Sequence, residues 1–229
     1  NYSQVRCDCV NTFTVVVSAI GTAGVTSTTS MDVMVYSSFS DVEAEDILSG
    51  GVIGAGKTWY WAANLPLHVG MGPVEDDYGN GEFAYGAWWP GPDAWDDEKG
   101  CMYDNEFIFT RTADGLTFEQ TTGPAFVPGT YADFLGIGAN QCYDETVATN
   151  MFGVKNVSIV PSESKAALEG SYDNKEYRGT TFEISDGGFM GWYVGDVIYD
   201  IISITENSLH VRCIQEGGGF AWYAKYKTQ

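Results

Sequence analysis

Basic residues are scarce in this sequence of 229 residues. Its 11 lysines and arginines stand against 31 aspartates and glutamates, which gives a formal net charge of −20. A field of this sign repels phosphate backbones, so we expect no nucleic-acid partner. No stretch approaches the roughly 20 apolar residues that a membrane-spanning helix needs. Gly-x-Ser-x-Gly elbows and phosphate-binding loops are also missing, and His68 and His210 lie too far apart in the chain to predict a catalytic dyad.

The five cysteines show no spacing typical of a metal site; they are Cys7, Cys9, Cys101, Cys142 and Cys213. Cys101 and Cys142 lie outside the expected strands, so an intradomain disulfide, if one forms, is expected between them. Cys213 lies in an expected core strand and is predicted to be a buried free thiol. The sequence therefore predicts no metal centre built on cysteine and no cofactor.

Hydrophobic residues make up 44% of the chain, enough for a core, and 28 glycines suit many tight turns between short strands. Strands are predicted by β-favouring, alternating segments at 57–63, 106–111, 116–121, 154–160, 180–185, 189–194, 198–205, 209–214 and 220–227. Because no strand–helix alternation occurs, a parallel α/β sheet is excluded. The expected fold class is all-β, with an antiparallel β-sandwich or barrel over residues 51–229.

The first forty residues form a separate pattern. Phe13, Val15 and Val17 alternate with polar residues, and a second alternating run through Met31 and Val33 follows a short turn. Two strands cannot make an independent core, so either further strands precede them or the pair packs on the next domain. Ser40 and Glu43 have capping-box spacing, which predicts a short helix that ends at Gly50. The expected organisation is residues 1–39, a helical linker over 40–50, and a module over 51–229.

Aromatic and acidic side chains gather in the long polar stretch from 64 to 100. Proline and glycine restrict the backbone there, so indole rings can be presented rigidly, and a sugar offers an apolar C–H face to a ring and hydroxyls to carboxylates. The candidate ligand-binding residues of this stretch are Trp88, Trp89, Asp93, Trp95, Asp96 and Asp97. Alternation would turn at least one of the two adjacent tryptophans inward.

Four further residues are candidates for the same ligand site: Trp61, His68, Trp192 and Tyr193. Trp192 and Tyr193 straddle an expected strand, so one of them is expected to be exposed. Trp59 and Trp222 are interpreted as core residues.

Paired carboxylates offer an alternative, because a glycosidase needs two acids on either side of one bond. Asp104 and Glu106 could share a strand face, but no Glu-x-Asp-x-x-Glu arrangement of the laminarinase type occurs, so no catalytic residue is assigned. Asp93, Asp96, Asp97 and Asp104 could also supply oxygen ligands to calcium, although EF-hand spacing is absent. Solvated loop acids are the simpler interpretation.

Two sets of motifs resemble a known group of proteins. Asn11–Ser18 followed by Met31–Val35 looks like the last two strands of a PKD domain, an immunoglobulin-like sandwich. The later chain is similar to the C-terminal module of surface glycan-binding proteins from Bacteroidetes polysaccharide-utilisation systems. The motifs that carry this similarity are Leu48–Gly51, Lys57–Trp59, His68–Pro73, Trp88–Trp89, Cys101–Asp104, Gly187–Gly191 and Ala221–Tyr223.

This resemblance implies non-catalytic capture of a neutral polysaccharide, often a β-glucan of the laminarin or mixed-linkage type, by aromatic stacking. It also implies an outer-membrane lipoprotein at the cell surface, as a full-length precursor, beside a porin-like glycan importer. A monomer is expected. The runner-up hypothesis is a structural or adhesion module without a ligand, and a glycoside hydrolase comes third.

Overall fold

The computed structural model describes residues 9–22, 25–37, 39–75, 88–91, 99–172, 175–195 and 197–229. Two compact units make up the chain, Asn1–Ser40 and Asp41–Gln229. The sequence expectations that fall on Asp93, Trp95, Asp96 and Asp97 lie outside the described residues. Within the described ranges, no helix has both the length and the apolar character needed to cross a bilayer.

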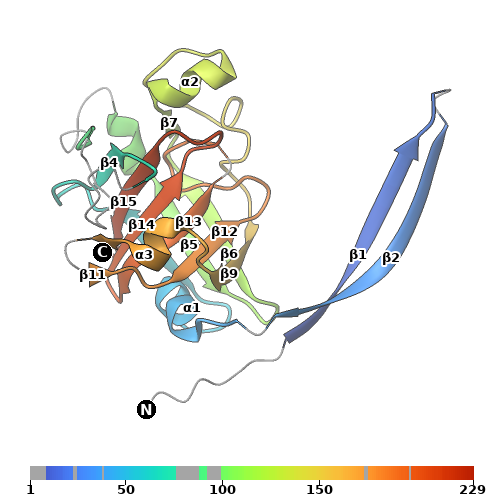
Figure 1. Ribbon diagram of the computed structural model, residues 1–229. Helices are drawn as coiled ribbons and strands as arrows, with labels where there is room; N and C mark the ends of the chain where they lie inside the picture. Colours follow the sequence, from blue (N-terminus) through green and yellow to red (C-terminus); the bar gives the residue numbers. More distant parts are fainter. Residues whose placement is uncertain are drawn as a thin grey trace. The chain divides into compact units, whose positions relative to one another are not determined.

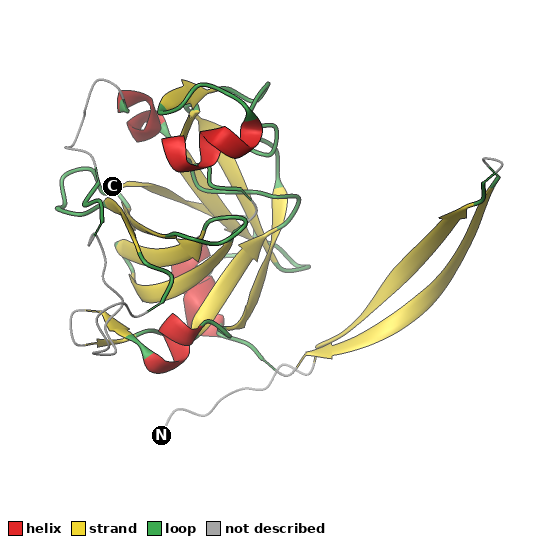
Figure 2. Ribbon diagram, turned by 45° about the horizontal axis from the view of Figure 1, so that its top comes forward, coloured by secondary structure: helices red, strands yellow, loops and turns green. Residues whose placement is uncertain are grey.

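The first unit is a two-stranded antiparallel ribbon (Figure 2). Its strands are β1 (Cys9–Ile20) and β2 (Thr26–Ser37). Val15 pairs with Met31 on one face, while Thr14 Oγ1 on the other donates to Asp32 Oδ1 at 2.6 Å. The two predicted strands are confirmed. Val15, Val17 and Met31 lie on one face, and Thr14 and Asp32 lie on the other together with Val16 and Met34.

Eight strands of the second unit close into an antiparallel barrel (Figure 1). In chain order they are β3 (Gly56–Trp61), β5 (Glu106–Arg111), β6 (Leu116–Thr122), β9 (Lys155–Pro161), β12 (Thr180–Ile184), β13 (Ile198–Thr205), β14 (Ser208–Ile214) and β15 (Ala221–Lys227). Each strand pairs with the next, and β15 pairs back with β3. A short strand, β4 (Val69–Gly72), continues along the same edge of β15 beyond β3. The antiparallel β prediction is confirmed, and the closure makes it an up-and-down barrel.

Aromatic rings fill the barrel, as expected for eight strands, whose interior is just wide enough for side chains. Trp61 and Tyr226 lie 4.6 Å apart between ring centroids, and Phe182 stacks on Tyr199 at 4.9 Å. Cys213 is a buried free thiol, as predicted, and burial raises its pKa to about 12.

The segment 189–194 is not a strand, and that prediction is wrong. It enters the barrel end instead, where Tyr199 Oη and Tyr226 Oη bond to the backbone N–H and carbonyl of Met190, at 3.0 and 3.1 Å. Gly191 has φ of +73°, and a Cβ there would overlap Asn105 Oδ1 and Phe107. A left-handed glycine in so tight a space breaks the extended conformation that a strand needs.

The remaining elements lie around the barrel (Figure 1). They are α1 (Val42–Ser49), the 3₁₀ helix η1 (Gly100–Asp104), β7 (Ala125–Val127), α2 (Gly129–Leu135), β8 (Gln141–Tyr143), α3 (Lys165–Glu169), β10 (Ser171–Tyr172) and β11 (Lys175–Glu176). α1 and α2 lie at opposite ends of the barrel. Ala44 and Leu48 of α1 belong to the barrel core, so the helix expected as a linker is part of the second unit.

Asp41 caps α1, rather than the predicted Ser40. Its Oδ1 accepts a hydrogen bond from Ala44 N at 3.1 Å. Arg178 Nε and Nη2 donate hydrogen bonds to the same carboxylate, both at 2.7 Å, and Thr180 Oγ1 donates to it at 2.6 Å. Burial alone would raise the pKa of Asp41, but these hydrogen bonds outweigh it and lower the pKa to about 2. Asp41 therefore ties α1 to the start of β12.

Acid should remove this tie. A carboxyl whose folded-state pKa is depressed stabilises the fold above its unfolded pKa, and the contribution is lost as the pH falls toward the folded value. As the pH falls from about 4 to about 2, protonation of Asp41 should lower the free energy of unfolding by about 1–2 kcal/mol, solvent screening included. Urea unfolding of the wild type and of Asp41→Asn should show a gap at pH 7 that closes toward pH 2. A gap that stays constant with pH would contradict this.

Candidate functional site

A pocket of about 230 Å³ opens at the α2 end of the barrel. Its aromatic lining consists of Trp89, Phe126, Trp192 and Trp222. Its other described lining residues are Met71, Pro128, Gly129, Thr130 and Asn140. Segments far apart in the sequence therefore meet here: the 88–91 segment, the plug at 189–194, β15, and the excursion from β7 through α2 to β8.

The three indoles form one cluster. Trp89 stacks on Trp192 with centroids 5.7 Å apart and planes at 30°, and it meets Trp222 edge-on at 6.0 Å. Trp192 and Trp222 are 5.3 Å apart, and Phe126 lies 4.7 Å from Trp192. Trp192 and Trp222 are 6% and 4% exposed, whereas Trp89 is only partly buried. Trp89 is thus the most accessible of the three rings, and it packs on the two buried ones.

Backbone contacts hold Trp89 in place. Met71 N donates to Trp89 O at 2.9 Å, and Trp89 N donates to Met71 O at 3.3 Å, which makes a bridge between β4 and the 88–91 segment. Gly91 follows with φ of +89°, and a Cβ there would collide with the carbonyl of Val69. Only glycine allows this close approach, so the segment is fixed against β4.

Similar contacts fix the two inner tryptophans. Phe126 N donates to Gly191 O at 3.0 Å and Tyr193 N donates to Phe126 O at 2.9 Å, which joins β7 to the plug beside Trp192. Trp222 Nε1 donates to Gln215 Oε1 at 3.2 Å. The ring cluster is therefore held by backbone and side-chain hydrogen bonds before any ligand arrives.

The pocket wall formed by residues 128–140 carries polar groups. Asn140, at φ of 52°, accepts a hydrogen bond from Gly129 N through Oδ1 at 3.0 Å. Thr130 Oγ1 and Trp192 Nε1 are both buried without a hydrogen-bond partner among the described residues. A buried polar group left unpaired costs about 1–3 kcal/mol, and both of these atoms belong to residues that line the pocket. The described lining includes no acidic or basic side chain.

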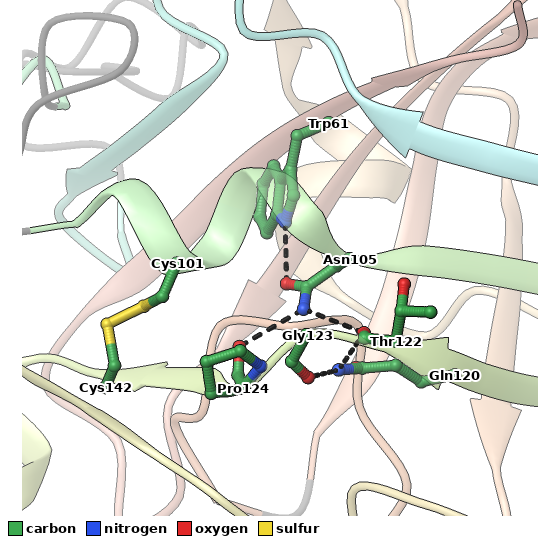
Figure 3. Close-up of a disulfide and its surroundings, with 8 residues drawn as sticks. All are labelled: Trp61, Cys101, Asn105, Gln120, Thr122, Gly123, Pro124 and Cys142. Carbon is green, nitrogen blue, oxygen red and sulfur yellow. Dashed lines mark hydrogen bonds between the residues drawn. A yellow bond between two sulfur atoms is a disulfide. The ribbon is translucent and has the colours of Figure 1, made fainter.

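A disulfide fastens this wall to the barrel (Figure 3). Cys101 of η1 is bonded to Cys142 of β8, as the sequence predicts. Asn105, which is fully buried, accepts from Trp61 Nε1 at 3.2 Å and donates to the carbonyls of Thr122 and Pro124 at 3.2 and 3.1 Å. The entry to β7 and the middle of β8 are therefore both tied to the η1 region.

Loss of this disulfide should loosen the pocket more than the barrel. For the Cys101→Ser/Cys142→Ser double variant we expect about 2–4 kcal/mol less stability and a folded barrel. Binding of any pocket ligand should weaken about three- to tenfold, because Asn140 lies two residues from the lost bond. Urea unfolding and titration calorimetry, each with and without reductant, measure both effects. Reductant should not change the double variant further; an affinity that withstands reduction of the wild type would refute the tether.

The structure separates the residues predicted for the site. Trp89 and Trp192 line the pocket, whereas Trp88 is 48% exposed and meets Phe220 edge-on at 5.8 Å, outside the lining. Trp61 lies deeper, at a small internal cavity that Trp192 and Trp222 also border. Tyr193 packs against Tyr131 instead, with centroids 5.2 Å apart.

His68 is a buried structural residue. It is 3% exposed, and its Nε2 lies 2.7 Å from Tyr103 Oη while Nδ1 lies 3.1 Å from Leu65 O. Burial lowers its pKa, against the effect of the bond to Leu65. His68 therefore stays neutral near pH 7 and does not reach the pocket lining.

The carboxylates considered for catalysis do not share a strand face, since Asp104 ends η1 and only Glu106 lies in a strand. Glu106 accepts from Thr121 Oγ1 at 3.2 Å. Among the described residues, no group of three histidines, cysteines or acids is placed to hold a metal ion.

No protein-family model matches the chain, and no curated protein matches it in sequence. The site therefore rests on its own geometry. Sequence reasoning missed the wall residues from 126 to 140, which follow no periodic pattern and come together through the β7–β8 pairing. The one signal in the sequence was Cys142. Its expected disulfide with Cys101 brings the segment from β7 to β8 next to η1.

Proposed function

We propose that this protein captures a neutral glycan, without cleaving it, in the aromatic pocket at the α2 end of the barrel. The observation that carries the proposal is the combination of three clustered indoles with two buried polar atoms, Trp192 Nε1 and Thr130 Oγ1, that have no hydrogen-bond partner in the described part of the chain. A sugar ring offers the matching surfaces, because its C–H face stacks on an indole and its hydroxyls both donate and accept hydrogen bonds. The described part of the lining holds no charged side chain, which favours an uncharged ligand.

A β-glucan of the laminarin or mixed-linkage type is the ligand class that the motif resemblance favours. The same resemblance places the full-length protein at the bacterial cell surface as an outer-membrane lipoprotein, beside a glycan importer. The β1–β2 ribbon is then the final hairpin of a PKD-like, immunoglobulin-type domain, and the barrel unit is the carbohydrate-binding module. The face that carries Val15, Val17 and Met31 supports this, since sandwich strands bury one face.

Affinity electrophoresis against laminarin, mixed-linkage glucan, xylan and mannan tests the proposal. We expect retardation by one or both β-glucans and no release of reducing sugar on incubation. Release of reducing sugar would replace the binding proposal with a glycoside hydrolase. Unchanged mobility with all four polymers would favour the alternative, a structural or adhesion module whose aromatic residues serve only as core.

A further inference from the structure

A second hollow, on the outer wall of the barrel, shares none of its described lining residues with the aromatic pocket. This outer groove has a volume of about 720 Å³ and lies over the neighbouring strands β9, β12, β13 and β14. Its volume falls in the range of about 300–1,000 Å³ that is usual for ligand sites. The outer face of a barrel strand is normally in contact with water and carries polar side chains. The floor of this groove does not follow that pattern.

Aliphatic side chains form the floor. Ile198 of β13 is 53% exposed and Val160 of β9 is 37% exposed, and Ile214 of β14 lies beside Ile198 in the sheet. Thr181 of β12 separates the two sides, since it pairs with Val160 on one side and with Asp200 on the other. Covering these aliphatic groups would remove apolar surface from water, at roughly 25 cal/mol per Å².

Carboxylates border this floor. The negative charge of Asp200 is already compensated within the protein. Arg212 lies 3.6 Å away, and Ser162 and Thr181 donate hydrogen bonds to Oδ1 at 2.6 and 3.1 Å. The uncompensated negative charge of the lining therefore comes from Glu163 and Glu216, and the described lining holds no basic residue.

Both border carboxylates belong to segments with fixed backbones. Glu216 accepts from Tyr131 Oη at 2.7 Å, and its own N–H donates to Val194 O at 3.0 Å. Glu163 lies directly before Ser164, the N-cap of α3, whose Oγ accepts from Ala167 N at 3.1 Å. The Glu216 carboxylate is thus held at one border of the groove, and Glu163 lies at another border beside the capped start of α3.

We propose that the outer groove is a docking site for an extended, lysine-bearing segment of a partner protein. A lysine stem is four methylenes long and covers aliphatic surface while its ammonium group reaches a carboxylate at the border. The net charge of −20 adds a long-range field that steers a basic partner toward the protein. This second site goes beyond glycan capture and does not depend on it.

Two fluorescent probe peptides of equal charge test the proposal by anisotropy at about 0.15 M salt, where unspecific surface attraction is largely screened. One repeats Lys-Leu and the other repeats Lys-Ser. We expect the Lys-Leu peptide to bind at least about tenfold more tightly, because only its side chains cover the aliphatic floor. The variants are Glu163→Gln/Glu216→Gln, Ile198→Ser, and Glu206→Gln as a control in the exposed β13–β14 turn.

The double glutamine variant should weaken the Lys-Leu peptide at least about tenfold, and Ile198→Ser should erase its advantage over the Lys-Ser peptide. The control Glu206→Gln should bind like the wild type, and thermal melts should show all variants folded, because the changed side chains are exposed or lie at the surface. Equal loss in the control, equal binding of the two peptides, or full displacement by spermine would overturn the docking site in favour of unspecific cation attraction.

Discussion

Replacing Trp89 by alanine should weaken binding of a β-glucan oligosaccharide at least tenfold, which is about 1.4 kcal/mol. Trp89 is the accessible ring of the cluster, stacked at 5.7 Å on Trp192, so its removal takes away the stacking surface and leaves the inner rings in place. The bridge to Met71 is made by backbone atoms and survives the change. Titration calorimetry measures the loss, and thermal melts confirm that the variant is folded.

Trp88→Ala is the matched control, because it removes the same ring from the neighbouring position. Trp88 is 48% exposed and lies outside the described pocket lining. We expect binding to change by less than about twofold and stability by less than about 0.5 kcal/mol. If Trp88→Ala abolishes binding while Trp89→Ala does not, the ligand lies on the outer surface of this segment and the pocket assignment is wrong.

A second large effect concerns the barrel itself. Trp59 is fully buried, and its Nε1 donates to Leu48 O at 2.9 Å, which links β3 to α1. Trp59→Ala should lower the free energy of unfolding by about 3–5 kcal/mol, since it leaves a cavity and an unpaired carbonyl. Glycan affinity of the folded fraction should not change, because Trp59 does not line the pocket.

Trp59→Phe keeps a ring in the core and should cost clearly less, so it protects the test if the alanine variant fails to fold. Urea unfolding gives both values. A loss below about 1 kcal/mol for Trp59→Ala would mean that α1 and β3 are not coupled through this residue.

Much of the barrel follows from local patterns. Eight of the nine predicted strand segments are the eight barrel strands, because alternation and turn residues such as Asp114-Gly115 specify a strand and its ends without long-range information. The ninth, 189–194, has the composition of a strand, but Gly191 and the bonds to Tyr199 and Tyr226 make it a plug. Contacts of that kind are tertiary and leave no periodic signal.

The pocket was only partly predictable for the same reason. Tryptophan composition pointed to Trp89 and Trp192, yet neither the partnership of Trp222 nor the role of Thr130 is visible in the sequence. In the sequence, Trp222 fits the core alternation of β15. The contact of its ring with Trp89 at the end of the barrel depends on the tertiary fold. Histidine is a residue type often found in functional sites, which made His68 a candidate. Its two hydrogen bonds inside the fold show that it has a structural role.

The indole N–H resonance of Trp192 offers the most direct measurement of the central claim. The protein has seven tryptophans, so a nitrogen–proton correlation spectrum holds a small set of indole signals, and Trp192→Phe assigns the one that matters. On titration with laminarihexaose, we predict that this signal shifts in proportion to saturation, because the buried N–H gains a hydrogen-bond acceptor. Saturation of binding with the Trp192 signal unmoved would show that the glycan binds elsewhere and that the aromatic pocket is not its site.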